Sequence, residues 1–464
     1  MYKTAILLLA AGLLIPCNSQ GLYAKNFKRS SLDDKLYILA AESGFHALEK
    51  PKSERPELVN LGRMLFFDKI LSGNSNISCA TCHHPRTFLG DELPTSIGEG
   101  AHGLGFKRRV RSSARLIPRN APPLFNLGLK GITALFWDNR LSIDPVTGYL
   151  HTPEKKISGP TPVRSDIFGL LTTPLAAQAL FPITSIDEML GLPEANTSGT
   201  DTSKERIWAE LLSRLIGSQE RNKKGISEYK LLFKKAFPKI EDLNQFNIRH
   251  AAHAIGAFEK DAFITVNTPL DKFMRGDIHA MTESQKRGGI VFFSKGKCGR
   301  CHSGPHLSDF SAHGLGVPQI GPGKEEPFND VGFALTTGMP EDNYKFRTPP
   351  LRNVSVTGPY MHDGAFGTLE DTVKHIIDPH ISMGNYNECK ITHKDFLGTI
   401  DINRRDNLRR LNAVDQIIRE GIILKMQEFD DLMNFLREAL TDPAVYGMEW
   451  LVPDRVPSGL RVGD

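Results

Sequence analysis

One short motif occurs twice in this chain and constrains its fold more than any other feature. The pattern Cys-x-x-Cys-His spans residues 79–83 and recurs at residues 298–302. It is the attachment signature of c-type haem: two thiols bond covalently to the porphyrin, and the adjacent histidine ligates the iron. The sequence therefore predicts two covalently bound haem c groups. The residues expected to hold them are Cys79, Cys82 and His83 in the first motif and Cys298, Cys301 and His302 in the second.

The sequence before each motif is repeated as well. Leu-Phe-Phe-Asp at residues 65–68 precedes the first motif, and Val-Phe-Phe-Ser at residues 291–294 precedes the second. The alternative is a zinc site built from the two Cys-x-x-Cys pairs. Pairs of that kind normally lie close together in a sequence, and zinc gives no reason for a histidine after both. The repeat thus predicts two related domains, each with its own haem.

The rest of the pattern is helical, and alternating strand patterns are missing. Apolar residues at helical spacing predict helices at residues 53–67, 205–216, 246–263, 284–293 and 429–440. A length of 464 residues exceeds one ordinary domain. We therefore expect a mostly α protein of two cytochrome-c-like haem domains with long loops. The expected boundaries are residues 25–275 for the N-terminal domain and 276–464 for the C-terminal domain.

The first 24 residues predict an export signal. Lys3 precedes an apolar stretch from Ala5 to Ile15, which has the length of a signal sequence and is too short to span a bilayer. Cys17 faintly resembles a lipoprotein cleavage site, but Pro16 beside it fits poorly, so we favour ordinary cleavage over a lipid anchor. We expect a periplasmic protein. A net charge of +4 gives no reason to expect a nucleic-acid partner.

Beyond these motifs the chain resembles the bacterial di-haem cytochrome c peroxidases. The MauG-type enzymes, which oxidise residues of a partner protein, are close relatives of that family. The resemblance runs from about Leu58 to Tyr446, and its motifs occur in the family order. They are Leu71-Ser-Gly-Asn-x-x-Ile-Ser-Cys79, Leu93-Pro-Thr-Ser-Ile-Gly98, Arg119-Asn120-Ala-Pro122, Phe136-Trp137-Asp138, Phe258-Glu259, Phe273-Met-Arg-Gly276-Asp277, Arg347-Thr-Pro-Pro-Leu-Arg352-Asn353, Pro359-Tyr360-Met361-His362-Asp363-Gly364 and Thr368-Leu369-Glu370.

The resemblance implies an enzyme that reduces hydrogen peroxide to water with electrons from a small donor protein, a cytochrome c or a cupredoxin. In the family, peroxide binds at the open iron face of the N-terminal haem, while a six-coordinate C-terminal haem takes up electrons. Trp137 matches a tryptophan between the haems, where it would relay charge; the alternative is that Trp137 is a large packing residue. The family also places calcium between the haems, on positions that match Asn120, Thr357 and Pro359.

Two other functions stay open from the sequence. One is a MauG-like oxidase that modifies a partner protein, and the other is a di-haem electron-transfer cytochrome without turnover. The resemblance also leaves the electron donor unnamed and allows a homodimer.

Two departures from the family pattern concern the N-terminal haem. Glu99 stands where a histidine caps the iron in classical members, and His102 is the other candidate cap. Ala176 stands where the family has an acid that moves a proton between the peroxide oxygens. Glu99 and the nearby Gln178 are therefore the candidate catalytic residues, unless the loop register is shifted.

A third departure concerns the distal ligand of the C-terminal haem. Counted from Thr368-Leu369-Glu370, that position is Ile376, which cannot ligate iron. His375 is adjacent and is the expected replacement, with His380 and Met383 as further candidates.

Overall fold

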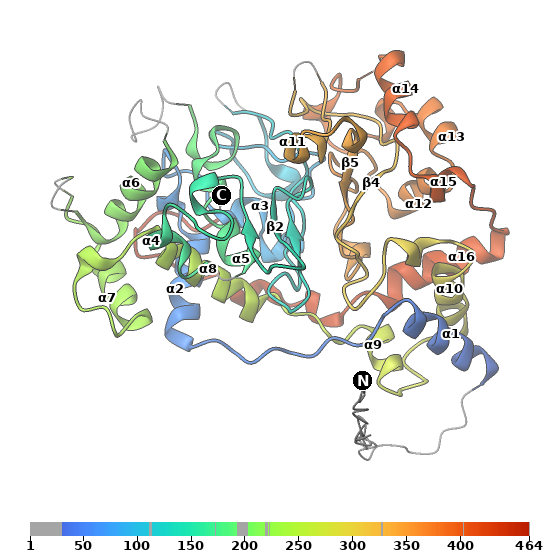
Figure 1. Ribbon diagram of the computed structural model, residues 1–464, viewed down its shortest axis with the longest axis horizontal. Helices are drawn as coiled ribbons and strands as arrows, with labels where there is room; N and C mark the ends of the chain where they lie inside the picture. Colours follow the sequence, from blue (N-terminus) through green and yellow to red (C-terminus); the bar gives the residue numbers. More distant parts are fainter. Residues whose placement is uncertain are drawn as a thin grey trace, which may run out of the picture.

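Helices and long loops make up most of the structure, a computed structural model (Figure 1). It describes residues 30–463 apart from 111–113, 172, 193–202, 219–220, 222, 326–327 and 402. The predicted export signal, with Cys17, lies outside the described residues. Strands within the described part are short, so the predicted mostly α fold is confirmed.

The helices of the first half are α1 (Ser31–Glu42), α2 (Pro56–Phe67), α3 (Cys79–Cys82), α4 (Ser165–Phe168), α5 (Pro174–Gln178), α6 (Lys204–Ile216), α7 (Ser227–Ala236), α8 (Ile248–Ala262) and α9 (Pro269–Met274). Those of the second half are α10 (Glu283–Phe293), α11 (Ala334–Thr337), α12 (Leu369–Ile377), α13 (Pro379–Gly384), α14 (Arg404–Asn412), α15 (Gln416–Arg419) and α16 (Met426–Asn434). The five predicted helices correspond to α2, α6, α8, α10 and α16. The last is shorter than expected because a π-turn, Phe435–Ala439, follows it.

The strands form two small antiparallel sheets. β1 (Ala134–Leu135), β2 (Leu141–Ile143) and β3 (Leu150–His151) form one, and β4 (Ala312–Gly314) and β5 (Lys345–Arg347) form the other. Leu135 pairs with Leu141, so residues 136–140 form the turn of a hairpin. That turn carries the Phe-Trp-Asp motif.

The helices that build two hydrophobic cores form two groups side by side in Figure 1. The first is built where α2 packs on α8, with α5, α6 and α7 around them. The second is built where α10 packs on α16 and α1. Leu36 of α1 belongs to the second core, and Leu451 near the C-terminus belongs to the first. Segments near both ends of the described chain thus pack on the core of the other half. The domain boundaries expected at residues 275 and 276 stay a prediction.

The same glycine contact sets the helix crossing in both cores. A Cβ atom on Gly62 of α2 would lie 1.9 Å from the carbonyl oxygen of Ala254 in α8. A Cβ atom on Gly288 of α10 would lie 1.9 Å from the carbonyl oxygen of Asp431 in α16. Each glycine stands four residues before the first phenylalanine of its Phe-Phe pair. The repeated sequence therefore reflects a repeated helix crossing that only glycine allows.

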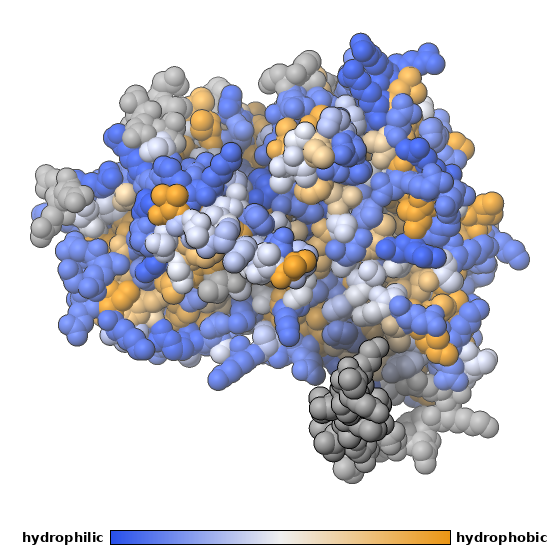
Figure 2. Space-filling model, viewed as in Figure 1, coloured by the Kyte–Doolittle hydropathy of each residue, from blue (hydrophilic) through white to orange (hydrophobic). Residues whose placement is uncertain are grey.

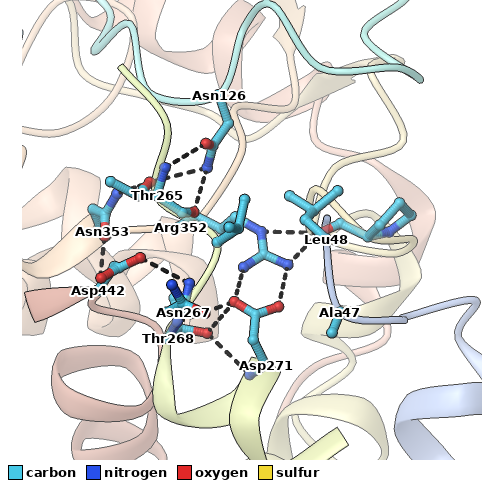
Figure 3. Close-up of polar contacts among 12 residues, drawn as sticks. Ala47, Leu48, Asn126, Thr265, Asn267, Thr268, Asp271, Arg352, Asn353 and Asp442 are labelled. Atoms are coloured by element: carbon cyan, nitrogen blue, oxygen red, sulfur yellow. Dashed lines mark hydrogen bonds and ion pairs between the residues drawn. The ribbon is translucent and has the colours of Figure 1, made fainter. Parts of the chain in front are cut away.

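Buried polar contacts join the segments between the two cores (Figure 3). The guanidinium of Arg352 binds both carboxylate oxygens of Asp271, at 2.5 and 2.9 Å. Asn353 donates to the hydroxyl of Thr265 and accepts from the backbone N–H of Asp442. Bidentate, buried contacts of this kind fix one orientation of the partners.

Among the described residues, none of the helices combines the length and the apolar character needed to cross a bilayer. The face drawn in Figure 2 is mostly hydrophilic, with small separate hydrophobic spots. Scattered apolar residues of this sort are normal on protein surfaces and mark no interface by themselves.

Replacing Gly288 tests the crossing. Gly288→Ala should lower the free energy of unfolding by about 3 kcal/mol, because the new methyl group meets backbone rather than a flexible side chain. Gly384→Ala at the end of α13 is the control: it meets open space, and the change should stay within about 1 kcal/mol. Denaturant unfolding of the haem-loaded protein measures both. Equal effects would contradict the importance of the crossing.

Candidate haem sites

The first motif lies in the wall of a cavity in the first half. α3 carries Cys79 and Cys82, His83 ends it, and all three side chains line the cavity. The Nδ1 atom of His83 lies 2.9 Å from the carbonyl oxygen of Leu89. A hydrogen bond there leaves the lone pair on Nε2 for a metal. Burial lowers the pKa of His83 to about 4, so the ring is neutral, as iron ligation requires.

The second motif repeats this arrangement in a second cavity. Cys298, Cys301 and His302 line it, and Nδ1 of His302 lies 2.9 Å from the carbonyl oxygen of Leu307. Burial lowers the pKa of His302 to about 4. Each cavity therefore offers two free thiols and one oriented neutral imidazole. This donor set fits a covalently attached haem c in both places.

Trp137 and Asn120 line both cavities. The indole Nε1 of Trp137 donates to the carbonyl oxygen of Asn120 at 2.9 Å, and the backbone N–H of Arg347 donates to the carbonyl of Trp137 at 2.8 Å. Only 8% of Trp137 is exposed. The hairpin turn thus holds this indole rigidly between the two predicted haem positions.

The three positions expected to bind calcium all belong to the lining of the second cavity. Asn120, Thr357 and Pro359 all line it. The side-chain amide nitrogen of Asn120 donates to the carbonyl oxygens of Leu93 and Pro94, which leaves Oδ1 available as a ligand. The oxygen donors fit calcium.

Of the two candidate acid–base residues, the structure brings only Gln178 to the first cavity. Glu99 is 7% exposed and does not line that cavity. Its Oε1 instead accepts hydrogen bonds from the side-chain amides of Asn74 and Asn76, at 2.8 and 2.5 Å. The expectation that Glu99 serves the peroxide is therefore corrected: its carboxylate is held by amides inside the loop. His102, the alternative cap, is exposed and does not line the cavity either.

The acid that the sequence analysis missed is Glu188, in the π-turn Ile186–Leu190. Glu188 lines the first cavity together with Gln178. Ala176, where the family register placed an acid, packs instead against α8, with its Cα 3.0 Å from the position of a Cβ on Gly256. This packing is compatible with the alternative of a shifted loop register, which stays a prediction. The sequence signal was an acid ten residues after Gln178, beyond the expected spacing.

A second missed acid, Glu259 of α8, also lines the first cavity. Burial alone raises the pKa of Glu259 to about 8, so its carboxyl group is mostly protonated at neutral pH. The Phe258-Glu259 motif contained the signal, but nothing in the sequence showed that the carboxyl group reaches the cavity.

His375 does not reach the second cavity. The ring is completely buried, with Nε2 2.9 Å from the carbonyl oxygen of Leu315 and its centroid 4.8 Å from that of Phe366. Its neighbours Ile376 and Ile377 line the cavity instead. The expectation that His375 is the distal ligand is corrected for this reason, and His380 and Met383 do not line the cavity either.

A buried ion-pair network lies at the edge of the first cavity. Arg119 binds both carboxylate oxygens of Asp330, at 2.7 and 2.8 Å, and a second carboxylate, that of Asp138, at 2.6 Å. Despite burial, the charge of Arg119 holds the pKa of Asp330 below its usual range. Asp330 belongs to the second half of the chain, whereas Arg119 and Asp138 belong to the first. The network therefore joins the halves beside Trp137.

Comparison with known proteins agrees with this geometry. Residues 56–279 match the family model of the di-haem cytochrome c peroxidases. The methylamine utilization protein MauG of Methylorubrum extorquens is 31% identical over 325 residues, 69% of this chain and 69% of that protein. The cytochrome c551 peroxidase of Pseudomonas aeruginosa is 30% identical over 324 residues, 70% of this chain and 72% of that protein.

The chain belongs to the di-haem cytochrome c peroxidase family. The resemblance seen in the sequence is confirmed, and with it an oxidoreductase that carries haem c.

Solved structures share the fold. A MauG-like protein associated with microbial copper homeostasis superimposes with a TM-score of 0.55 at 24% identity, over 87% of this chain and 95% of that one. The diheme peroxidase BthA of Burkholderia thailandensis gives a TM-score of 0.54 at 19% identity, over 90% and 94%. At such identities the likeness concerns the fold alone.

Removing one acid of the ion-pair network tests its role. Asp330→Asn should lower the free energy of unfolding at pH 7 by about 3–5 kcal/mol, because Arg119 loses a buried partner. The folded-state pKa of Asp330 is depressed, so this stabilisation is present above the unfolded-state pKa of about 4 and fades as the pH falls below it. The difference in free energy of unfolding between wild type and Asp330→Asn should therefore shrink as the pH is lowered.

The matched control for this experiment is a surface pair. Glu228→Gln breaks the exposed contact with Arg455, and the cost should stay below about 1 kcal/mol. A pH-independent gap between wild type and Asp330→Asn would contradict the electrostatic explanation.

Proposed function

We propose that this protein reduces hydrogen peroxide to two water molecules, using two protons and two electrons from a small redox protein. The observation that carries this proposal is that Trp137 forms part of the wall of both haem cavities. An indole in that position connects a site that receives electrons with a site that consumes them. Family membership supports the same activity.

In this proposal Cys79 and Cys82 attach the peroxidatic haem and His83 ligates its iron, within the N-terminal domain of residues 25–275. Cys298, Cys301 and His302 hold the electron-transfer haem in the C-terminal domain of residues 276–464. A haem bound at the first site would supply the iron centre for peroxide reduction. The residues of the chain orient the group, exclude water and manage protons.

Glu188 and Gln178 are the residues that serve the peroxide. The Glu188 carboxylate accepts a proton from one peroxide oxygen and returns it to the other, as general acid–base catalysis requires. The Gln178 amide donates and accepts hydrogen bonds and orients the substrate. Glu259, mostly protonated, is a reserve proton donor in the same wall.

Calcium would bind between the haems, on Asn120 Oδ1 and the carbonyl oxygens of Thr357 and Pro359. Support comes from their common place in the wall of the second cavity. Asn120 also accepts the indole N–H of Trp137 on its backbone carbonyl. An ion there would stiffen the support of Trp137 as well as the cavity wall.

The donor in this proposal is a cytochrome c or a cupredoxin, and the protein acts in the periplasm, where an export signal at residues 1–24 would deliver it. A homodimer is compatible with the proposal. No part of it calls for a nucleic acid.

A second candidate is a MauG-type oxidation of a partner protein. The 31% identity with a MauG protein favours it specifically. Stoichiometry separates the two: a peroxidase oxidises two one-electron donor molecules for each peroxide consumed, whereas a partner-protein oxidase consumes peroxide with its partner protein and no reduced donor.

Trp137→Phe tests the relay. Donor-driven peroxide turnover should fall by at least about an order of magnitude, while both haems and peroxide binding in the first cavity are retained. Stopped-flow spectra of donor oxidation and of peroxide binding measure the two effects. Trp208→Phe is the control, because Trp208 is buried in α6 and lines neither cavity. Equal turnover in Trp137→Phe and wild type would make Trp137 a packing residue.

Glu188→Gln tests the acid. Turnover should fall by about 100-fold or more, since the amide cannot carry the proton, whereas peroxide affinity should change little. Glu99→Gln provides the comparison and should keep the turnover of wild type for each haem bound. The opposite result, a slow Glu99→Gln and a normal Glu188→Gln, would return the role to Glu99.

A further inference from the structure

The second cavity has an aliphatic wall where helices α12 and α15 and the segment after α15 face it. The residues of this wall are Thr372, Val373, Ile376, Ile377, Ile417, Ile418, Ile422 and Leu424. The hydroxyl of Thr372 donates to the carbonyl oxygen of Thr368 at 2.9 Å. The aliphatic side chains cannot ligate iron, and the Thr372 hydroxyl is engaged in its hydrogen bond. Ile376 stands where the family has its distal ligand.

Ligand-type side chains elsewhere in the lining are engaged in other contacts. Both ring nitrogens of His313 contact carboxylates, Nε2 that of Asp309 at 2.9 Å and Nδ1 that of Asp415. The hydroxyl of Tyr360 donates to the carbonyl oxygen of Val354 at 3.0 Å. His313 has no ring nitrogen free for iron without breaking these contacts, and Tyr360 would bind iron as a phenolate only by losing the proton that it donates to Val354.

The Nζ atom of Lys297, which also lines the cavity, donates to the carboxylate of Glu420 at 3.1 Å. Met361 and His362 are then the remaining candidates in the lining. Met361 packs with Val317 and Phe366 in a small hydrophobic cluster. The ring of His362 stacks on Phe346, with centroids 3.5 Å apart and an angle of 11°. Its carbonyl oxygen accepts the backbone N–H of Asn120, a residue that also lines the first cavity, and its Nε2 lies 4.0 Å from the carboxylate of Asp363.

We infer that the haem of the second cavity has no protein ligand opposite His302, so that its iron is five-coordinate and binds small neutral molecules such as carbon monoxide or nitric oxide. The inference rests on the attachment of haem at Cys298 and Cys301, and it goes beyond peroxide reduction. An aliphatic wall favours a neutral diatomic ligand, because it offers no group to hydrogen-bond or deprotonate a polar one. Peroxide cleavage stays with the first cavity, where Glu188 is present.

The test introduces a ligand at the position that lacks one. Ile376→His should convert one high-spin ferric haem per chain into a low-spin haem, measured by quantitative electron paramagnetic resonance of the holoprotein. In the reduced state, wild type should bind one more carbon monoxide per chain than Ile376→His. Ile376→Met should also reduce the high-spin signal, since a thioether is a haem ligand as well.

Met361→Leu and His362→Phe are the matched controls in the same cavity. Both should keep the spin-state count and carbon monoxide stoichiometry of wild type. The inference is overturned if either variant gains a high-spin haem, because the lost side chain was then the ligand. It is also overturned if Ile376→His and Ile376→Met leave the spin-state count and the carbon monoxide stoichiometry unchanged. Peroxide turnover of wild type, measured separately, tests the proposed function and not this inference.

Discussion

The rest of the structure depends on one close contact between helices, made twice. Where α2 crosses α8 at Gly62, and where α10 crosses α16 at Gly288, the backbones approach so closely that a methyl group would overlap a carbonyl oxygen. Each crossing fixes the helix that leads into a Cys-x-x-Cys-His motif. The thiols and the imidazole must meet one rigid porphyrin, so their approach has to be set by backbone packing rather than by flexible side chains.

Between the two cores, buried polar contacts join segments of the two halves. Arg119 with Asp330 and Arg352 with Asp271 are bidentate buried pairs, and such pairs fix orientation better than apolar contacts do. The hairpin turn that carries Trp137 lies within this junction. The backbone carbonyl of Trp137 accepts a hydrogen bond from the backbone N–H of Arg347 in the other half, and its indole N–H donates to the carbonyl of Asn120. The position of Trp137, on which the proposed charge relay depends, is therefore set by the same bonds that join the halves.

The two cavities differ in chemistry although their proximal sides match. Both hold a buried neutral histidine whose Nδ1 lies 2.9 Å from a carbonyl oxygen. The first cavity is also lined by Gln178, Glu188 and Glu259, an amide that forms hydrogen bonds and two carboxyl groups that can exchange protons. The second adds a row of isoleucines. The same arrangement of helix and motif thus occurs beside two different cavities. The first has side chains that can donate and accept protons, whereas the wall that α12 gives to the second has no titratable side chain.

The sequence by itself determined the fold class and the family, and it predicted the two haem attachment sites. Covalent attachment of haem needs two thiols and a histidine within one turn of chain, so contiguous residues carry that signal. Helices such as α8 and α10 follow from local periodicity and from caps such as Asn247 and Thr282. The tertiary structure decided which side chains reach the cavities. A helix turns about 100° per residue, so His375 and Ile376 point in different directions although they are adjacent. Glu188 rather than Glu99 lines the first cavity because the Asn74 and Asn76 amides hold one carboxylate and a π-turn presents the other.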